Sequence, residues 1–424
     1  MRIIFCGTPE YAVPSLRRLA RLPGHELVAI VSQPDQPKGR SRAPTPPPVV
    51  AAAHALGFTP ERIFQPRSLN QSAVLQKLKA LAPDLLCVIA FGQLLKPAAL
   101  ALPRLFALNA HGSLLPKFRG AAPIQAALLA GEKETGVSIM KIELGLDRGP
   151  VMLRRSLPVG EDDDAGSLHD KLAELSAECF AEALAAVETG QFTFTPQDER
   201  AASYASKLTK ESGKIDWKLD AEYLQRFIRA MNPWPGAWTS VSASTGGKRQ
   251  RVRVAKCAVW EAPPGLSFRA PVAECGETAP EGQPSIARGR SPWLKSPIDA
   301  KSPGRAAEVF DVTDGRPSGA FPSRGAANQG LPPLAINGCP SGAKQHSATG
   351  PLTLSGQGVA QPPPAVSTGE GACATISNEA GIIVRCGRGA LLLRQIQPEG
   401  GRVMSVAEYL RGAGRSFAPE SRWE

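Results

Sequence analysis

The chain has 424 residues with 49 Lys and Arg against 38 Asp and Glu, a formal charge of +11, and it contains 41 Gly and 40 Pro. This length allows two or three domains. The sequence has no apolar run of about 18 residues, which argues against a transmembrane helix, and no secretory segment precedes its first apolar run. The eight cysteines and five histidines lack metal-ligand spacing, and the cysteines lack a disulfide pattern. We therefore expect a cytoplasmic protein with reduced thiols and no bound metal.

The glycine and proline residues are concentrated in one part of the chain. Residues 262–368 contain 17 Pro and 14 Gly and show neither a helical nor an alternating apolar period. A segment of this composition rarely buries enough apolar area to offset the entropy of ordering. The composition predicts a disordered insertion, and a proline-rich docking segment for a partner is the alternative interpretation.

The first 190 residues alternate between strand-like and helix-like patterns. Apolar runs at residues 2–6, 26–32 and 84–90 are typical of buried parallel strands, and helical patterns lie near residues 70–82 and 167–189. The alternation predicts an α/β fold with an open, doubly wound, mostly parallel sheet and helices on both faces. The chain has no GxGxxG and no GxxxxGKS/T motif. This Rossmann-like sheet is therefore not expected to bind a dinucleotide or to form a P-loop.

The segment NAHGSLLP at residues 109–116 combines an amide and an imidazole at the end of a short predicted strand. Because Asn109 and His111 are two residues apart, both side chains point to the same face of that strand. They lie at its carboxyl end, where open α/β sheets bind ligands. An amide that donates to an oxyanion, beside an imidazole that moves protons, suits acyl transfer. The alternative is a structural histidine bonded to a backbone carbonyl.

A carboxylate that could orient this imidazole lies 36 residues downstream of His111. Asp147 stands between Gly145 and Gly149, after a strand-like run over residues 137–144. A carboxylate beside an imidazole supports its charged form. Because the two residues are far apart in the sequence, they can meet only through the fold.

The segment 109–116, followed by RGAAP at 119–123, resembles the signature of the 10-formyltetrahydrofolate-dependent formyltransferases. Several further motifs narrow the resemblance to the members that act on methionyl-tRNA. They lie at residues 2–10, 33–37, 64–66, 145–147, 204–208, 215–217 and 228–235. The similarity extends from residue 2 to about 261 and resumes near 369, and several motifs in one order make it specific.

The resemblance implies transfer of a formyl group from 10-formyltetrahydrofolate to the α-amino group of methionyl initiator tRNA. It implies that Asn109 and protonated His111 stabilise the tetrahedral oxyanion while Asp147 supports His111. The implied folate pocket is lined by Phe91, Gly92, Gln93, Ser113, Leu114, Leu115 and Pro116. The sequence departs from the family pattern at Arg148, where threonine is usual, which places a cation next to Asp147.

Two basic segments are candidates for binding tRNA. The loop at residues 37–42 carries Lys38, Arg40 and Arg42, which charge alone would assign to a solvated loop. The resemblance implies instead that this loop holds the acceptor arm. In the alternating segment 248–256, one strand face carries Arg249, Arg251 and Arg253. Such a stripe suits phosphates, or it marks an edge strand protected by charge.

The predicted organisation is a catalytic domain over residues 1–190, a linker over 191–206, and a second domain formed by 207–261 and 369–424, which flank the insertion. The resemblance implies that this second domain is a small OB-like β-barrel that binds tRNA. Residues 1–200 carry 22 basic and 20 acidic side chains, whereas 201–261 and 369–424 together carry 18 and 11. The excess favours a polyanionic partner. We expect a monomer without a membrane partner.

Two other functions share part of this pattern. A formyltransferase acting on a nucleotide sugar or small amine would share residues 109–147 but would not need the basic loop or the basic second domain. A catalytically inactive tRNA-binding protein would keep the basic segments, but the presence of Asn109, His111 and Asp147 argues against it.

Overall fold

The structure is a computed structural model that describes residues 1–37, 43–242, 249–261, 294–295, 372–377, 381–412 and 422–423. The predicted insertion at 262–368 lies outside these residues apart from Leu294–Lys295, and so do Lys38, Arg40 and Arg42. The chain divides into two units, Met1–Lys301 with Pro363–Glu424, and Ser302–Pro362; the elements described below belong to the first.

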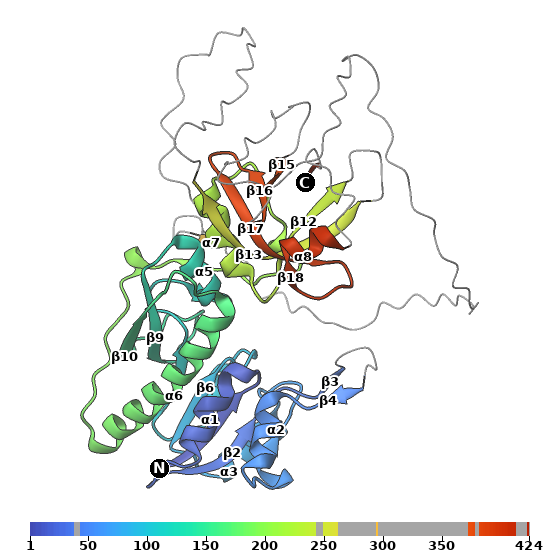
Figure 1. The fold of residues 1–424 in the computed structure, drawn as a ribbon. Coiled ribbons are helices and arrows are strands. Elements are labelled where there is room, and N and C mark those ends of the chain that lie inside the picture. The colour runs from blue at the N-terminus through green and yellow to red at the C-terminus, as the bar shows by residue number, and fades with distance from the viewer. Residues whose placement is uncertain are drawn as a thin grey trace, which may run out of the picture. The chain divides into compact units, whose positions relative to one another are not determined.

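The N-terminal half forms a seven-stranded sheet with the order β10-β9-β7-β6-β1-β2-β5 (Figure 1). Five neighbouring strands are parallel, and β9 and β10 add an antiparallel edge. The strands are β1 (Arg2–Gly7), β2 (Glu26–Val31), β5 (Ile63–Phe64), β6 (Leu85–Ile89), β7 (Phe106–His111), β9 (Glu134–Lys141) and β10 (Val151–Pro158). The predicted mostly parallel sheet is confirmed. The antiparallel edge was not predicted, because an apolar run does not encode the direction in which a strand pairs.

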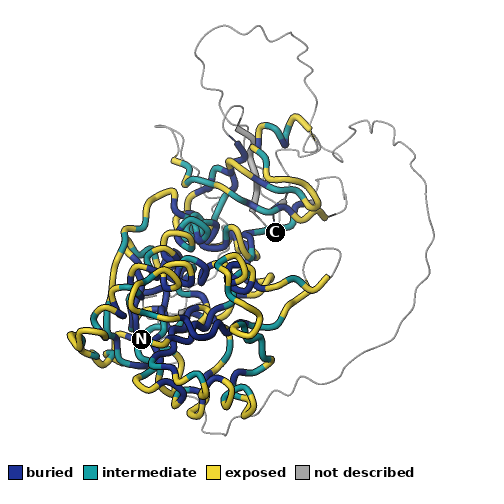
Figure 2. Tube along the Cα trace, turned by 90° about the horizontal axis from the view of Figure 1, so that it is seen from below, coloured by how far each residue is buried: buried dark blue, intermediate teal, exposed yellow. Residues whose placement is uncertain are grey.

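Two hydrophobic clusters cover the two faces of this sheet. Alternate residues of β1 point to opposite sides, so Ile3 and Phe5 belong to one cluster and Ile4 and Cys6 to the other. The first cluster includes residues of α1, α2, α5 and α6, and the second includes residues of α3 and α4. Figure 2 shows these buried residues inside the fold and the exposed ones outside. Each fully buried aliphatic side chain contributes about 1.5–3 kcal/mol.

The helices begin and end where the sequence supplies caps and breaks. The long helix α6 starts after Asp164, whose carboxylate accepts a hydrogen bond from Ser167 N, and it ends at Gly190 with φ of 71°. The helices are α1 (Val13–Leu19), α2 (Pro48–Ala55), α3 (Ser72–Ala80), α4 (Pro97–Leu100), α5 (Pro123–Ala130), α6 (Ala165–Thr189), α7 (Ala221–Met231) and α8 (Val406–Arg411), with 3-10 turns η1 (Glu10–Ala12), η2 (Pro60–Arg62), η3 (Glu199–Ala201) and η4 (Glu211–Gly213).

The C-terminal part forms a second seven-stranded sheet that closes on itself. Its order is β13-β12-β19-β15-β16-β17-β18, and β13 also pairs with β17, which closes the barrel. The strands are β12 (Ala237–Ser242), β13 (Gln250–Trp260), β15 (Ala372–Ser377), β16 (Gly381–Arg385), β17 (Ala390–Pro398), β18 (Met404–Ser405) and β19 (Arg422–Trp423). This closed antiparallel barrel agrees with the OB-like prediction.

Two small sheets complete the described elements. β3 (Gln36–Pro37) pairs with β4 (Pro44–Thr45) beside the basic loop. β11 (Tyr204–Ala205) lies between β8 (Arg119–Gly120) and β14 (Leu294–Lys295). Because β11 lies at the end of the predicted linker, its pairing with β8 attaches the linker to the N-terminal part of the chain.

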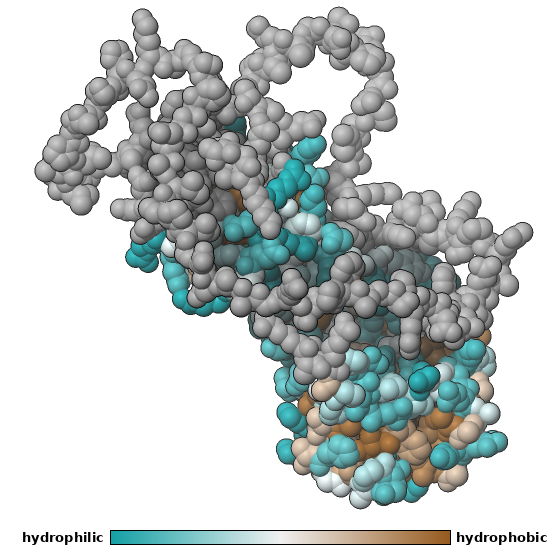
Figure 3. Space-filling model, turned by 90° about the vertical axis from the view of Figure 1, so that its right-hand side faces the viewer, coloured by the Kyte–Doolittle hydropathy of each residue, from teal (hydrophilic) through white to brown (hydrophobic). Residues whose placement is uncertain are grey.

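The surface is mainly hydrophilic where it can be seen. In the view of Figure 3, hydrophilic residues cover most of the described surface, and hydrophobic residues show between them on its lower part. Isolated apolar side chains on a surface are ordinary. None of the helices in the described ranges is long and apolar enough to span a membrane.

Candidate active site

Strand β7 brings the two predicted catalytic side chains to its carboxyl end. Leu108 and Ala110 belong to the first hydrophobic cluster, so Asn109 and His111 lie on the opposite face of the strand. His111 is buried with 6% exposure, and Asn109 is partly buried. In the sheet, His111 pairs with Ser138 of the antiparallel strand β9. The predicted placement of both residues at a strand end is therefore observed.

The two ring nitrogens of His111 face two acceptors. Nε2 lies 2.9 Å from the carbonyl oxygen of Phe118, and Nδ1 lies 3.6 Å from Oδ2 of Asp147. A carbonyl only accepts, so Nε2 carries a proton in this arrangement. Nδ1 then forms an ion pair with Asp147 when the ring is protonated. The structure thus combines both interpretations of the sequence, because His111 has a backbone carbonyl partner and a carboxylate partner.

Asp147 reaches His111 from the loop between β9 and β10. Strand β9 ends at Lys141, earlier than the predicted run to residue 144, so Asp147 lies within the loop rather than at a strand end. Its backbone is left-handed, with φ of 50°, and its Oδ2 accepts a hydrogen bond of 2.8 Å from Gly120 N. Aspartate is one of the few residue types that adopts this conformation readily. The loop therefore presents the carboxylate to His111 and to the β8 backbone together.

The first predicted folate segment follows β6. The Phe91 side chain is buried in the second hydrophobic cluster, and its carbonyl accepts hydrogen bonds from Thr8 Oγ1 and Gln33 Nε2. The Gln93 side chain joins the loop to its neighbour, accepting from Leu69 N at 2.8 Å and donating to Pro66 O at 3.1 Å. Gly92 has φ of 78°, and a Cβ there would lie 2.4 Å from Gln33 Nε2. The side chains of Phe91 and Gln93 thus hold the loop in place.

The second predicted folate segment is held by Ser138. Ser138 Oγ donates to the carbonyl of Ser113 at 2.7 Å and accepts from Leu115 N at 3.0 Å. Ser113 is buried and donates to Lys117 O, and Leu115 packs in a small apolar cluster. Leu114 and Pro116 are partly exposed. The segment therefore has a defined backbone course next to His111, and the serine on β9 was not singled out in the sequence.

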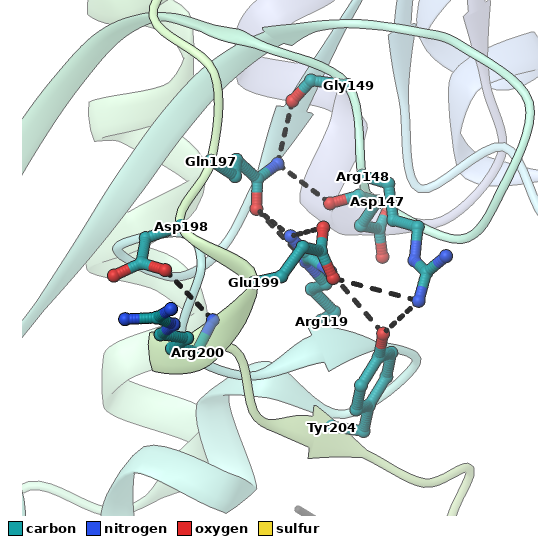
Figure 4. A network of polar contacts seen from close by, with 9 residues as sticks. All are labelled: Arg119, Asp147, Arg148, Gly149, Gln197, Asp198, Glu199, Arg200 and Tyr204. Atoms are coloured by element: carbon teal, nitrogen blue, oxygen red, sulfur yellow. Dashed lines mark hydrogen bonds and ion pairs between the residues drawn. The ribbon is translucent and has the colours of Figure 1, made fainter. Parts of the chain in front are cut away.

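Residues that the sequence analysis missed surround the Asp147 loop. Arg119 has a fully buried side chain, donates to Gln197 Oε1, and pairs with both carboxylate oxygens of Glu199 (Figure 4). Burial would lower the pKa of Arg119, but hydrogen bonds to Glu199 and Tyr204 raise it overall. The hydrogen bonds from Arg119 also lower the pKa of Glu199. Arg119 falls within the RGAAP motif, but no signal pointed to partners near residue 200.

Arg148, which follows Asp147 in the sequence, is directed toward Tyr204 and Glu199. Arg148 Nη2 lies 3.3 Å from the Tyr204 hydroxyl and 3.7 Å from Glu199 (Figure 4). The hydrogen bond with Tyr204 raises the pKa of Arg148. The departure from the usual threonine therefore adds a contact to β11.

The predicted basic stripe on β13 has the expected alternation. Val252 and Val254 are fully buried, whereas Arg251 is exposed and Arg253 is partly exposed on the other face. The Arg251 guanidinium lies 3.5 Å from the ring centroid of Trp238. Arg253 donates to the Asn232 side chain at 3.2 Å and to the carbonyl of Pro233. Arg249 is exposed just before the strand, so the three arginines have different environments.

Comparisons with known proteins agree with this architecture. The formyl transferase family matches residues 1–184, and the formyl transferase C-terminal domain family matches residues 207–279 and 341–414. A methionyl-tRNA formyltransferase from Stenotrophomonas maltophilia (strain R551-3) is 48% identical over 253 residues, covering 59% of this chain and 80% of that protein. One from Nitrosospira multiformis is 46% identical over 242 residues, covering 57% and 76%.

A solved methionyl-tRNA formyltransferase from Clostridium thermocellum aligns with 61% of this chain and 94% of that chain, at a TM-score of 0.42 and 14% identity. The extensive sequence identity to the curated relatives confirms the resemblance that the motifs indicated. The chain belongs to the methionyl-tRNA formyltransferase family.

Proposed function

We propose that the chain transfers the formyl group of 10-formyltetrahydrofolate to the α-amino group of methionyl initiator tRNA, with Asn109, His111 and Asp147 as its catalytic residues. The observation that carries this proposal is the approach of His111 Nδ1 to Asp147 Oδ2, 3.6 Å, at the carboxyl end of β7. Open α/β sheets bind their ligands at this end, and the chain's family membership identifies the class of reaction.

The chemistry is acyl transfer from one nitrogen to another. The methionyl amine attacks the formyl carbon, a new C–N bond forms, and the carbonyl oxygen becomes an oxyanion. The Asn109 amide donates to that oxygen, and the nearby imidazolium of His111 supplies positive charge. The C–N bond to the folate then breaks, its electron pair returns to the folate nitrogen, and the proton lost by the amine ends on that nitrogen.

Each ring nitrogen of His111 has a hydrogen-bond acceptor nearby. An imidazolium carries an N–H on each nitrogen, and its two neighbours here, Phe118 O and the Asp147 carboxylate, both accept hydrogen bonds. Asp147 balances the charge and provides a base close to the attacking amine. The segments at residues 91–93 and 113–116 would line the folate, since both lie after strands that end at this edge of the sheet.

The tRNA is proposed to bind through the basic segments. Lys38, Arg40 and Arg42 would hold the acceptor arm, and Arg249, Arg251 and Arg253 would contact phosphates. Arg251 is exposed and lies over the Trp238 ring, and Glu211 is 3.9 Å from its guanidinium. Arg253 already donates to the segment around Asn232, which leaves its guanidinium less available.

The test is a formyl-transfer assay with the full chain, labelled 10-formyltetrahydrofolate and methionine-charged tRNA. We expect formylation of initiator tRNA, and the reaction with elongator tRNA measures how strictly the chain selects between the two. His111→Ala is expected to lower kcat by about 100- to 10,000-fold, because a positioned acid–base group contributes that much. His54→Ala is the control, because His54 is exposed at the end of α2. The proposal would be overturned if neither tRNA were formylated, or if His111→Ala formylated initiator tRNA at the normal rate.

A further inference from the structure

The loop that carries Asp147 has little packing of its own. Two of its residues, Leu144 and Leu146, are 71% and 58% exposed, and Gly145 has φ of 109°. Such a loop gains few apolar contacts that would fix its position. The position of Asp147 therefore depends on hydrogen bonds from residues outside the loop.

Gln197 supplies two of those hydrogen bonds from a distant part of the chain. Its Nε2 donates to the carbonyl of Asp147 at 2.9 Å and to the carbonyl of Gly149 at 2.7 Å (Figure 4). A side-chain amide has two N–H groups, so both are used. The two accepting carbonyls lie on either side of Arg148, and Gln197 thus holds the loop across the residue that follows Asp147.

Arg119 determines which way the Gln197 amide points. Its Nε and Nη2 donate to Gln197 Oε1 at 3.0 and 2.9 Å. Because a guanidinium only donates, the amide oxygen must face Arg119 and the amide nitrogen must face the loop. The Arg119 side chain is fully buried and also pairs with Glu199. Its own orientation is therefore restricted.

The same short strand also holds the Asp147 carboxylate. Arg119 and Gly120 form β8, and Gly120 N donates to Asp147 Oδ2 at 2.8 Å. Gly120 thus contacts the Asp147 carboxylate directly, while Arg119 is linked to the Asp147 carbonyl through Gln197. Asp147 is held at both its main chain and its side chain from β8.

We infer that Gln197, oriented by Arg119, is a positioning residue that sets the Asp147 carboxylate against His111. This inference rests on the proposed catalytic role of Asp147. Gln197 lies in the segment between α6 and β11, so this segment takes part in building the active site as well as joining two domains.

The experiment replaces the amide by a carboxylate of the same shape. Gln197→Glu keeps an acceptor for Arg119 but removes both donors to the loop. We expect kcat to fall by about 10- to 100-fold, because a displacement of about 1 Å costs this much, with KM for both substrates changed by less than about 2-fold. Asp198→Asn is the matched control, because Asp198 is exposed and its side chain accepts from Arg200 N, which Asn can also satisfy. It should retain the kcat of the unmodified chain.

A double-mutant cycle separates positioning from a general structural role. If Gln197 acts through Asp147, Gln197→Glu should cause no further loss of kcat in an Asp147→Asn background. Thermal unfolding of each variant shows whether it is folded, and Gln197→Met replaces Gln197→Glu if that variant is not.

Three outcomes count against the inference. A normal kcat for Gln197→Glu while Asp147→Asn is impaired would overturn the positioning role alone. Additive losses in the double variant would show that Gln197 acts elsewhere. A normal kcat for Asp147→Asn would instead overturn the proposed role of Asp147, and with it this inference.

Discussion

Arg148 follows Asp147 directly, at the position where the family resemblance leads us to expect threonine. Its guanidinium is directed to Tyr204 and Glu199, on the side of β11 (Figure 4). The Arg148 and Glu199 side chains are 53% and 56% exposed, so their pairing is screened by water. The cation is therefore expected to influence the linker more than the Asp147 carboxylate.

Replacing Arg148 by threonine tests this interpretation. Arg148→Thr should change kcat by less than about 3-fold and the free energy of unfolding by at most about 1 kcal/mol, because exposed ion pairs contribute little. Steady-state kinetics and urea unfolding measure the two quantities. A loss of kcat as large as that expected for Gln197→Glu would show that the guanidinium does affect Asp147.

At the scale of elements, the acidic turn before α6 shows how carboxylates stabilise a helix start. Asp164 caps the helix, while the neighbouring carboxylate of Asp163 is buried and accepts from Gly160 N, Ser167 Oγ and Lys171 Nζ. Burial raises the pKa of Asp163, but Lys171, Ser167 and Gly160 lower it by more, so its pKa is below the usual value.

This lowered pKa predicts a pH-dependent contribution to stability. The unfolded carboxyl titrates near pKa 3.9 and the folded one below it, so the contribution is complete above about pH 4–5 and is lost as the pH falls through the folded pKa. Asp163→Asn should lower the free energy of unfolding by about 2 kcal/mol at pH 7, and by progressively less below about pH 4. Urea unfolding over this range measures the difference.

Asp162→Asn is the control for this prediction. Asp162 is 90% exposed and pairs with Lys256 at 3.1 Å, so its loss should cost less than about 1 kcal/mol at any pH. Equal costs for both variants, or a cost for Asp163→Asn that does not change with pH, would contradict the role given to Asp163.

At the scale of the whole molecule, most of the excess of positive charge lies outside residues 1–200. Residues 1–200 carry 22 basic and 20 acidic side chains, whereas residues 201–261 and 369–424 carry 18 and 11. A polyanionic substrate such as tRNA is attracted to the more basic part, and the attraction weakens with salt.

Salt dependence therefore distinguishes the two substrates. The KM for methionyl-tRNA should rise steeply with KCl concentration, whereas the KM for the folate should change little. Arg251→Gln should raise the KM for tRNA and reduce the slope of log KM against log salt by about 0.7–0.9, the value for one phosphate contact. Equal salt dependence for both substrates would argue against an electrostatic tRNA interface.

Much of the fold and part of the site follow from local patterns. Continuous apolar runs predicted β1, β2 and β6, because strands covered on both faces need apolar residues at every position. The alternation in β13 predicted which residues are buried, because successive strand side chains point to opposite faces. The spacing of Asn109 and His111 likewise placed them on one face of a strand end.

Other features depend on which segments meet in three dimensions. The 3.6 Å approach of Asp147 to His111, the antiparallel edge formed by β9 and β10, and the barrel closure between β13 and β17 each join parts that no local pattern relates. The bond between Gln197 and Arg119 spans 78 residues and has no signature of its own. Composition, charge and motifs determined the class of protein and the candidate catalytic residues. Only the tertiary structure shows which residues hold these side chains in place. Hydrogen-bond partners are groups that the folded chain brings close together, whatever their distance in the sequence.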